Sequence, residues 1–157
     1  MSGILQPSRK LLAAIEAVLD IAYAATDQPV SGQELTKRQG VPPRFLEPAL
    51  QALSRAGILS SERGPRGGYR LARERRRITL GDVCRAVAGI EDPEEEAKSA
   101  LGRKVVRPLF GDLDGEVMKR LDALTLEDLC QTAFTQDVPK RGGPDCDFSI
   151  QGPFSGG

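Results

Sequence analysis

Apolar and polar positions near the start of the chain follow the period of an amphipathic helix. The spacing predicts a helix from about Ser8 to Ala25, which Asp27-Gln28-Pro29 should end. The apolar positions that define its buried face are Leu11, Ile15, Val18, Leu19, Ala22 and Tyr23.

Two shorter helices are predicted next, joined by a turn that contains a glycine. Ser31 and Glu34 have the spacing of a capping box, in which the serine accepts from a first-turn amide and the glutamate reaches back. This helix should stop at Gly40, and the next one should open at Val41-Pro42-Pro43 and close at Gly57. A longer helix followed by two short ones predicts a helix-turn-helix unit.

Two short extended segments then flank a turn rich in glycine and proline. The segments are Ile58-Leu59-Ser60-Ser61 and Tyr69-Arg70-Leu71, and the turn holds Gly64, Pro65, Gly67 and Gly68. This order predicts a β-hairpin. A hairpin directly after a helix-turn-helix is a wing, so the predicted fold class is mainly α with a small β-hairpin, a winged helix-turn-helix domain followed by a long helix.

The segment that begins Ile78-Thr79-Leu80-Gly81-Asp82 predicts a further helix, with Thr79 as its cap and Asp82 in its first turn. Leu124-Thr125-Leu126-Glu127-Asp128 repeats this pattern later in the chain. We interpret the repeat as two helix starts that use the same capping chemistry, not as a duplicated domain.

A second apolar stripe has the spacing of a coiled-coil seam. Its positions are Phe110, Leu113, Val117, Leu121 and Leu124, at steps of three, four, four and three. Such a stripe suits a helix that packs along another helix. The spacing leaves open whether that partner belongs to the same chain or to a second copy.

Charge is segregated along the chain, although 22 basic and 22 acidic residues give a formal net charge of zero. Residues 63–77 (RGPRGGYRLARERRR) hold seven arginines and one glutamate, a net charge of +6, and the acidic run 91–96 supplies part of the compensation. This pattern predicts a surface whose positive field attracts a polyanion. The alternative is a solvated basic face with no partner.

The composition argues against an enzyme. Histidine is absent, which removes Ser-His-Asp and Cys-His catalysis and the commonest zinc ligand sets. The sequence also has no phosphate-binding glycine loop and no CxxC motif. The start of the chain does not match a signal peptide, and no run approaches the ~20 apolar residues of a membrane span. We therefore expect a cytoplasmic protein that does not contact membrane.

The three cysteines are too widely spaced to form a disulfide framework. Cys84 and Cys130 lie on apolar helical faces and are interpreted as small core residues. Cys146 lies between Asp145 and Asp147, whose carboxylates should raise the pKa of its thiol. A redox switch that links the tails or subunits is the alternative.

From Ser8 to Phe134, the sequence resembles the Rrf-two winged-helix regulators of bacteria. The matching stretches are Pro29-Val30-Ser31, Phe45-Leu46-Glu47, Leu53 with Ala56-Gly57-Ile58-Leu59, Ser61 to Ala72, Ile78 to Asp82 and Leu124 to Leu129. The resemblance implies a sequence-specific transcriptional regulator that binds a pseudo-palindromic operator as a homodimer. It also implies a long helix that crosses between subunits, for which the stripe from Phe110 to Leu124 is the candidate. A bound winged helix can exclude polymerase unaided, which favours a repressor.

The resemblance divides the chain into three segments. Residues 1–89 would form the winged helix-turn-helix DNA-binding domain, and residues 90–135 the linker and dimerisation helices. Residues 136–157, which are rich in glycine and proline, would form a flexible tail.

One part of the family pattern is missing. Several members hold an iron–sulfur cluster with three closely spaced cysteines, some with a nearby histidine, just before the long helix. Here residues 89–110 contain neither residue type, and the last cysteine and histidine positions fall near Lys104 and Arg107. An ammonium or guanidinium group cannot replace a thiolate on iron. We therefore expect no cofactor, and the resemblance does not specify a small-molecule or redox effector.

The resemblance and the charge pattern together predict how duplex DNA is bound. A thin hairpin tip with Arg63 and Arg66 could enter a minor groove, where narrow A·T tracts concentrate negative potential. Arg75, Arg76 and Arg77, at the base of the hairpin, would meet flanking phosphates.

The second helix of the helix-turn-helix is the predicted recognition helix, which opens at Pro43, and Pro43 is itself among the predicted DNA contacts. Arg44, Glu47 and Gln51 share one of its faces and could read guanine, cytosine and adenine respectively. A salt bridge between Glu47 and Arg44 is the alternative. The preceding helix should face phosphate through Ser31, Gln33 and Lys37. A different function class also stays open, a winged-helix interaction module whose arginines bind an acidic protein partner.

Overall fold

Helix α1 (Arg9–Ala22) lies at the centre of the fold and has the buried face that its apolar spacing predicts. In this computed structural model, residues 6–24, 26–92 and 95–142 are described. The hydroxyl of Ser8 accepts a hydrogen bond from the Leu11 N–H (3.0 Å), so the predicted start is confirmed. The helix ends three residues before the predicted boundary, with Tyr23 as its C-cap.

The helix-turn-helix consists of α2 (Gly32–Gln39) and α3 (Pro43–Arg55). Gly40 joins them with a φ of +66°, a left-handed conformation that favours glycine. The serine half of the predicted capping box forms, because the Glu34 N–H donates to the Ser31 hydroxyl (3.1 Å). The carboxylate of Glu34 instead lies 3.5 Å from the guanidinium of Arg38, one turn further along.

The predicted wing is confirmed as a hairpin of β1 (Leu59–Glu62) and β2 (Gly68–Leu71), paired antiparallel. The Val30 N–H donates to the Tyr69 carbonyl (3.1 Å), and the Tyr69 N–H donates to the Val30 carbonyl (2.8 Å). These two hydrogen bonds tie the wing to the segment before α2. Gly68 permits this approach, because a Cβ at that position would lie 2.4 Å from the Val30 carbonyl oxygen.

The two similar helix starts in the sequence contact each other in space. Helices α4 (Leu80–Ala88) and α6 (Leu126–Thr135) both begin with a complete capping box, from Thr79 with Asp82 and from Thr125 with Asp128. The Leu80 N–H donates to the Leu124 carbonyl (2.8 Å) and the Leu126 N–H to the Ile78 carbonyl (2.9 Å). The short helix η1 (Arg75–Arg77) connects the wing to α4.

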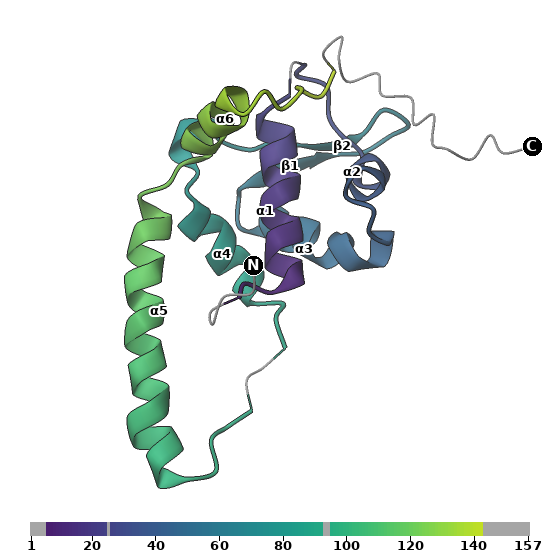
Figure 1. Ribbon diagram of the computed structural model, residues 1–157. Coiled ribbons are helices and arrows are strands. Elements are labelled where there is room, and N and C mark those ends of the chain that lie inside the picture. The colour runs from purple at the N-terminus through teal and green to yellow at the C-terminus, as the bar shows by residue number, and fades with distance from the viewer. Residues whose placement is uncertain (1–5, 25, 93–94, 143–157) are drawn as a thin grey trace, which may run out of the picture.

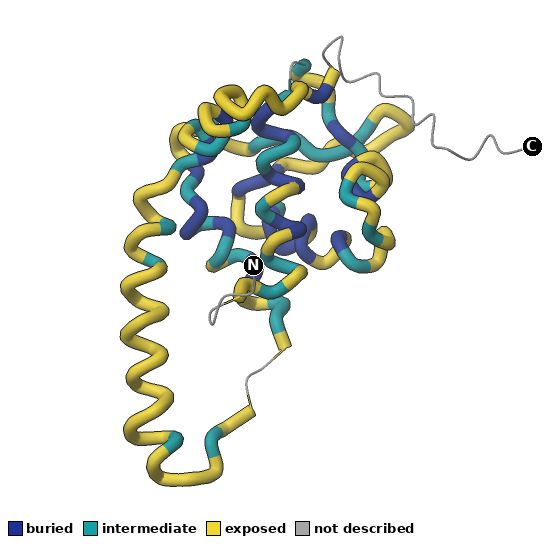
Figure 2. The backbone as a smooth tube through the Cα atoms, in the orientation of Figure 1, coloured by how far each residue is buried: buried dark blue, intermediate teal, exposed yellow. Residues whose placement is uncertain are grey.

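The long helix α5 (Arg107–Asp122) contacts α4, to which its last residue is tied by the ion pair between Asp122 and Arg85, and its other end stands away from the rest of the molecule (Figure 1). The chain leaves α4, runs to the far end of α5 through the π-helical segment η2 (Gly102–Val106), and returns along α5 to α6 (Figure 1). Figure 2 shows α5 exposed along most of its length. The predicted helix is therefore present, although Leu124, the last residue of its stripe, lies beyond the helix end.

The core lies where α1, α3, α4, α6 and the wing meet. Its largest fully buried side chains are Leu35, Leu46, Leu50, Leu53, Ile58, Ile78 and Leu126. Cys130 belongs to this core, as predicted, whereas Cys84 is only half-buried. Cys146 and residues 143–157 of the predicted tail lie outside the described residues. None of the described helices is both long and apolar enough to cross a membrane.

Candidate nucleic-acid interface

The arginines of residues 63–77 fall into two groups, those with a carboxylate partner in the chain and those without. Arg70, Arg73, Arg75 and Arg76 pair with Glu62, Asp82, Glu127 and Glu74 respectively. Arg63, Arg66 and Arg77 have no ion-pair partner among the described residues. The protein therefore neutralises part of this basic segment itself and leaves three of its guanidinium groups available.

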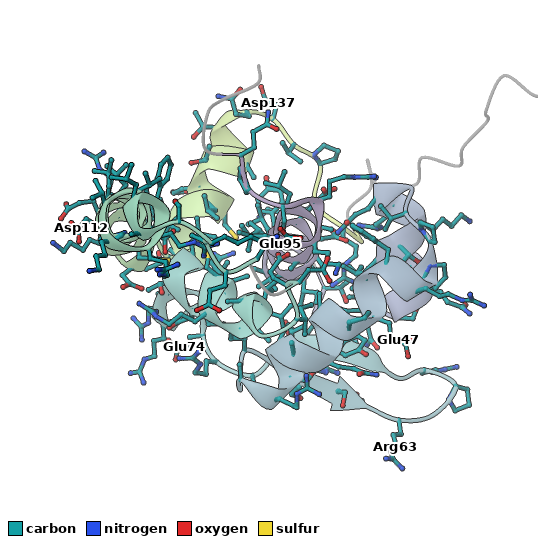
Figure 3. The ribbon with its side chains drawn as sticks, turned by 90° about the horizontal axis from the view of Figure 1, so that it is seen from below. Glu47, Arg63, Glu74, Glu95, Asp112 and Asp137 are labelled. Carbon is teal, nitrogen blue, oxygen red and sulfur yellow. The ribbon has the colours of Figure 1, made fainter. Side chains whose placement is uncertain are left out.

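Two of the available guanidinium groups lie at the tip of the hairpin. Arg63 and Arg66 are exposed, and Figure 3 shows Arg63 extending outward from the tip. Gly64 adopts a φ of +110° between them, which a residue with a side chain would reach only with strain. Arg70, by contrast, is held within the hairpin, where its guanidinium lies 2.7 Å from Glu62 and also donates to the Asp27 carbonyl.

Helix α3 presents the predicted polar face to solvent. Arg44, Glu47 and Gln51 are exposed on it, while Leu46 and Leu50 are buried on the opposite side. Pro43 occupies the first turn of α3, where a backbone N–H would have no intrahelical acceptor, so the missing N–H of proline costs no hydrogen bond. The alternative salt bridge between Glu47 and Arg44 is not formed in the described structure.

The recognition helix and the wing lie on the same side of the molecule. In Figure 3, Glu47 and Arg63 lie together at one side, and Asp112 on α5 lies at the other. Glu47 also acts electrostatically on Tyr69 of the wing. Burial raises the pKa of the Tyr69 phenol, and the negative charge of Glu47 raises it further. The two elements are therefore neighbours that can approach one ligand together.

Helix α2 places Gln33 and Lys37 in solvent beside α3. The Ser31 hydroxyl is already engaged by the Glu34 N–H, so any phosphate contact from Ser31 would add to its capping role. Arg38 anchors the other side of α2 through an ion pair with Asp20 on α1 (2.8 Å).

The three arginines at the base of the wing differ in their surroundings. Arg75 turns inward to Glu127 on α6, with a second N–H···O contact at 3.3 Å, and Arg76 pairs locally with Glu74 at 2.6 Å. Arg77 is exposed. The phosphate contacts expected of all three stay predictions.

A polar, exposed second helix beside an arginine-tipped hairpin defines the winged-helix class of DNA-binding proteins. The chain belongs to the Rrf2 family, described as "Iron-dependent Transcriptional regulator", whose pattern matches residues 8–132. It is a DNA-binding transcriptional regulator, as predicted, and the members of this family are regulators rather than enzymes. The alternative of a protein-interaction module is not favoured.

Similar proteins include "Protein rrf2" of Nitratidesulfovibrio vulgaris, 35% identical over 121 residues that cover 74% of this chain and 81% of that protein. The "HTH-type transcriptional regulator IscR" of Vibrio atlanticus is 30% identical over 150 residues, which cover 90% of this chain and 83% of that protein.

Solved structures of similar fold include IscR of T. potens, with a TM-score of 0.68 and 29% identity over 87% of this chain and 94% of that one. CymR, the global cysteine regulator of B. subtilis, has a TM-score of 0.61 and 28% identity over 82% of this chain and 98% of that one.

The iron in the family description raises the question of whether these residues suit an iron–sulfur cluster. Such clusters are held mainly by cysteine thiolates. Residues 89–110 contain no cysteine or histidine, and Lys104 lies within the π-helical segment at the start of the long helix. Within the described ranges, no group of three His, Cys, Asp or Glu residues could hold a metal ion. The donor groups of residues 89–110 therefore do not fit a cluster.

Proposed function

We propose that this regulator binds a pseudo-palindromic operator as a homodimer and represses transcription in the cytoplasm. The observation that carries the proposal is an arginine-tipped wing and an exposed recognition helix on one side of the molecule, with the exposed apolar stripe of α5 on the other. A twofold pair of such chains would present two recognition helices to successive turns of the major groove.

The dimer would form along α5. Its apolar residues Leu113 and Val117 are 42% and 43% exposed, and they lie one helical turn apart in a stripe that nothing in the described part of the chain covers. A helix of 16 residues is about 24 Å long, enough for several layers of contact with a second copy. Because this stripe contributes little to the core of one chain, substitutions in it should separate the subunits without unfolding them.

The dimer is tested by the solution mass of a variant that combines Leu113→Asp and Val117→Asp. Buried carboxylates in the helix pair would be unpaired, so we expect the dimer of the wild-type protein to become a folded monomer. Lys119→Gln, on the same helix at a side chain that is 75% exposed, should leave the mass unchanged. A wild-type protein that is monomeric at micromolar concentration contradicts the proposal.

On DNA, the polar face of α3 would enter the major groove and the wing tip would enter the minor groove. At the wing tip, Arg63 and Arg66 would contact the walls of the minor groove. On α3, Arg44, Glu47 and Gln51 would contact base edges. Helix α2 would contact the phosphate backbone. Selection of bound duplexes from a random library should return two inverted half-sites whose centres lie about one helical turn, or a multiple of it, apart. Enrichment of single or directly repeated half-sites would contradict a twofold complex.

We also propose that the protein functions without an iron–sulfur cluster, because residues 89–110, just before the long helix, supply no thiolate ligand. The protein purified without oxygen should be colourless and should bind its operator unchanged after treatment with an iron chelator. A coloured protein whose iron content is close to one cluster per subunit would contradict this.

A further inference from the structure

A cleft of about 250 Å³ lies between α1, the Arg75–Arg77 turn and α6, on a part of the molecule that the predicted DNA contacts do not use apart from Arg75. Helix α6 packs against both α1 and the turn, and Figure 1 shows α6 beside one end of α1. The chain that follows α6 closes one side, because the Tyr23 hydroxyl donates to the Val138 carbonyl (2.9 Å). The volume is below the roughly 300–1,000 Å³ of sites for drug-sized ligands, so an occupant would be small.

The charges that line the cleft leave one cation in excess. Arg75 and Glu127 neutralise each other through two N–H···O contacts. Lys140 has no carboxylate partner in the described part of the chain, and its ammonium lies 5.4 Å from the centre of the Tyr23 ring. The lining therefore carries a net charge of +1, which favours a ligand with one negative charge.

Apolar groups form much of the remaining lining. The Phe134 side chain is 65% exposed, unusually open for an aromatic ring on a helix that packs on the core. Cys130, in contrast, is only 3% exposed, and burial raises the pKa of its thiol. The thiol is thus neutral at neutral pH and belongs to the apolar wall. Covering the Phe134 ring with an apolar ligand surface would contribute about 25 cal/mol for each Å² removed from water.

We propose that this cleft binds a small organic monoanion, whose carboxylate meets Lys140 and Arg75 and whose apolar part covers Phe134. The bound carboxylate would compete with Glu127 for Arg75. Since Arg75 belongs to the same turn as Arg77 at the base of the wing, the competition loosens the contact between that turn and α6. We expect the ligand to lower the affinity of the protein for its operator. This regulatory effect rests on the proposed function, whereas ligand binding to the cleft is independent of it.

The probe for the site is 3-phenylpropionate, with neutral 3-phenylpropionamide as its matched control. Titration into the isotope-labelled protein without DNA, followed by NMR, should shift the resonances of cleft residues. We expect the carboxylate to bind about fivefold more tightly than the amide, the factor that an exposed ion pair of about 1 kcal/mol supplies. Equal affinities, or no shift of cleft resonances with the probe in large excess, would overturn the site.

Three variants assign the contacts. Lys140→Gln should lower the preference for the carboxylate, because only Arg75 then remains to contact it, and should leave the affinity for the amide unaffected. Phe134→Ala, at an exposed ring that the core does not require, should weaken both probes. Lys119→Gln on α5 removes the same charge elsewhere and should change neither. A preference for the carboxylate that Lys140→Gln leaves unchanged would show that the lysine does not take part in recognition.

Operator affinity measured with and without saturating 3-phenylpropionate tests the regulatory effect. A coupling free energy of about 1 kcal/mol would lower operator affinity roughly fivefold. Probe binding with unchanged operator affinity would keep the site and overturn its regulatory role. A protein that binds no DNA at all contradicts the proposed function, while the NMR titration still decides whether the cleft is a binding site.

Discussion

The substitution Arg63→Gln tests whether the wing tip of this protein contacts DNA phosphates. Arg63 is exposed at the wing tip and has no carboxylate partner among the described residues, so its guanidinium is available to a phosphate-lined groove. Glutamine keeps a polar side chain of moderate length but removes the charge. In a dimer, the substitution removes two phosphate contacts at once, one from each wing.

The salt dependence of binding gives the expected magnitude. If each subunit neutralises about three phosphates, a dimer neutralises about six, and the slope of log affinity against log salt is about −5.4. Removal of two contacts changes the slope to about −3.6. A doubling of the salt concentration should then weaken the wild-type protein about 40-fold and the variant about 12-fold.

The assay is fluorescence anisotropy of a labelled operator duplex at several salt concentrations. Arg70→Gln is the matched control, because it removes the same charge from the same hairpin but from a guanidinium that pairs with Glu62 and the Asp27 carbonyl. Its slope should equal that of the wild-type protein, provided that circular dichroism shows it folded. If the salt slope of Arg63→Gln equalled that of the wild-type protein, or if Arg70→Gln lowered the slope as much as Arg63→Gln does, the proposed contact between the wing tip and phosphate would be refuted.

Three further predictions address the recognition helix, the wing and a helix cap. Glu47→Ala should relax the preference at one base pair by about 1–3 kcal/mol and leave the salt slope unchanged, as measured with a panel of substituted operators. Gly68→Ala should lower the free energy of unfolding, measured in urea, by about 2 kcal/mol, because the new Cβ would lie 2.4 Å from the Val30 carbonyl oxygen. The control Gly111→Ala on α5 places its Cβ in open space and should not destabilise the protein. Hydrogen bonds with the Thr125 backbone and side chain lower the pKa of Asp128. The free energy that the ionised carboxylate contributes to folding is therefore fully present above its ordinary pKa of 3.8, and it is lost as the pH falls through the lowered pKa. Acid unfolding of Asp128→Asn should therefore depend less on pH in that range, and an identical dependence would show that the cap does not titrate with folding.

Features that depend on neighbouring residues could be predicted well. Helix caps such as Ser31 and Thr79 act on amides three residues away, and the glycines of the wing turn act through their own backbone. The helix-turn-helix, the wing and the long helix follow from such signals together with apolar spacing. The polar face of α3 was predictable for the same reason, since helical geometry alone brings Arg44, Glu47 and Gln51 to one side.

The amino-acid sequence by itself determined the α-helices and the wing, the family and the concentration of positive charge in residues 63–77, but not the turn η1 or the π-helical segment η2. Only the tertiary structure decided which of those arginines are available, because the carboxylate that engages Arg75 lies 52 residues away in Glu127. The same holds for the pairing of the α4 and α6 starts and for the cleft, whose walls run from Tyr23 to Lys140. Local patterns report the conformation that a residue prefers, but electrostatic pairing and cavity shape depend on groups that only the packing of the whole chain brings together.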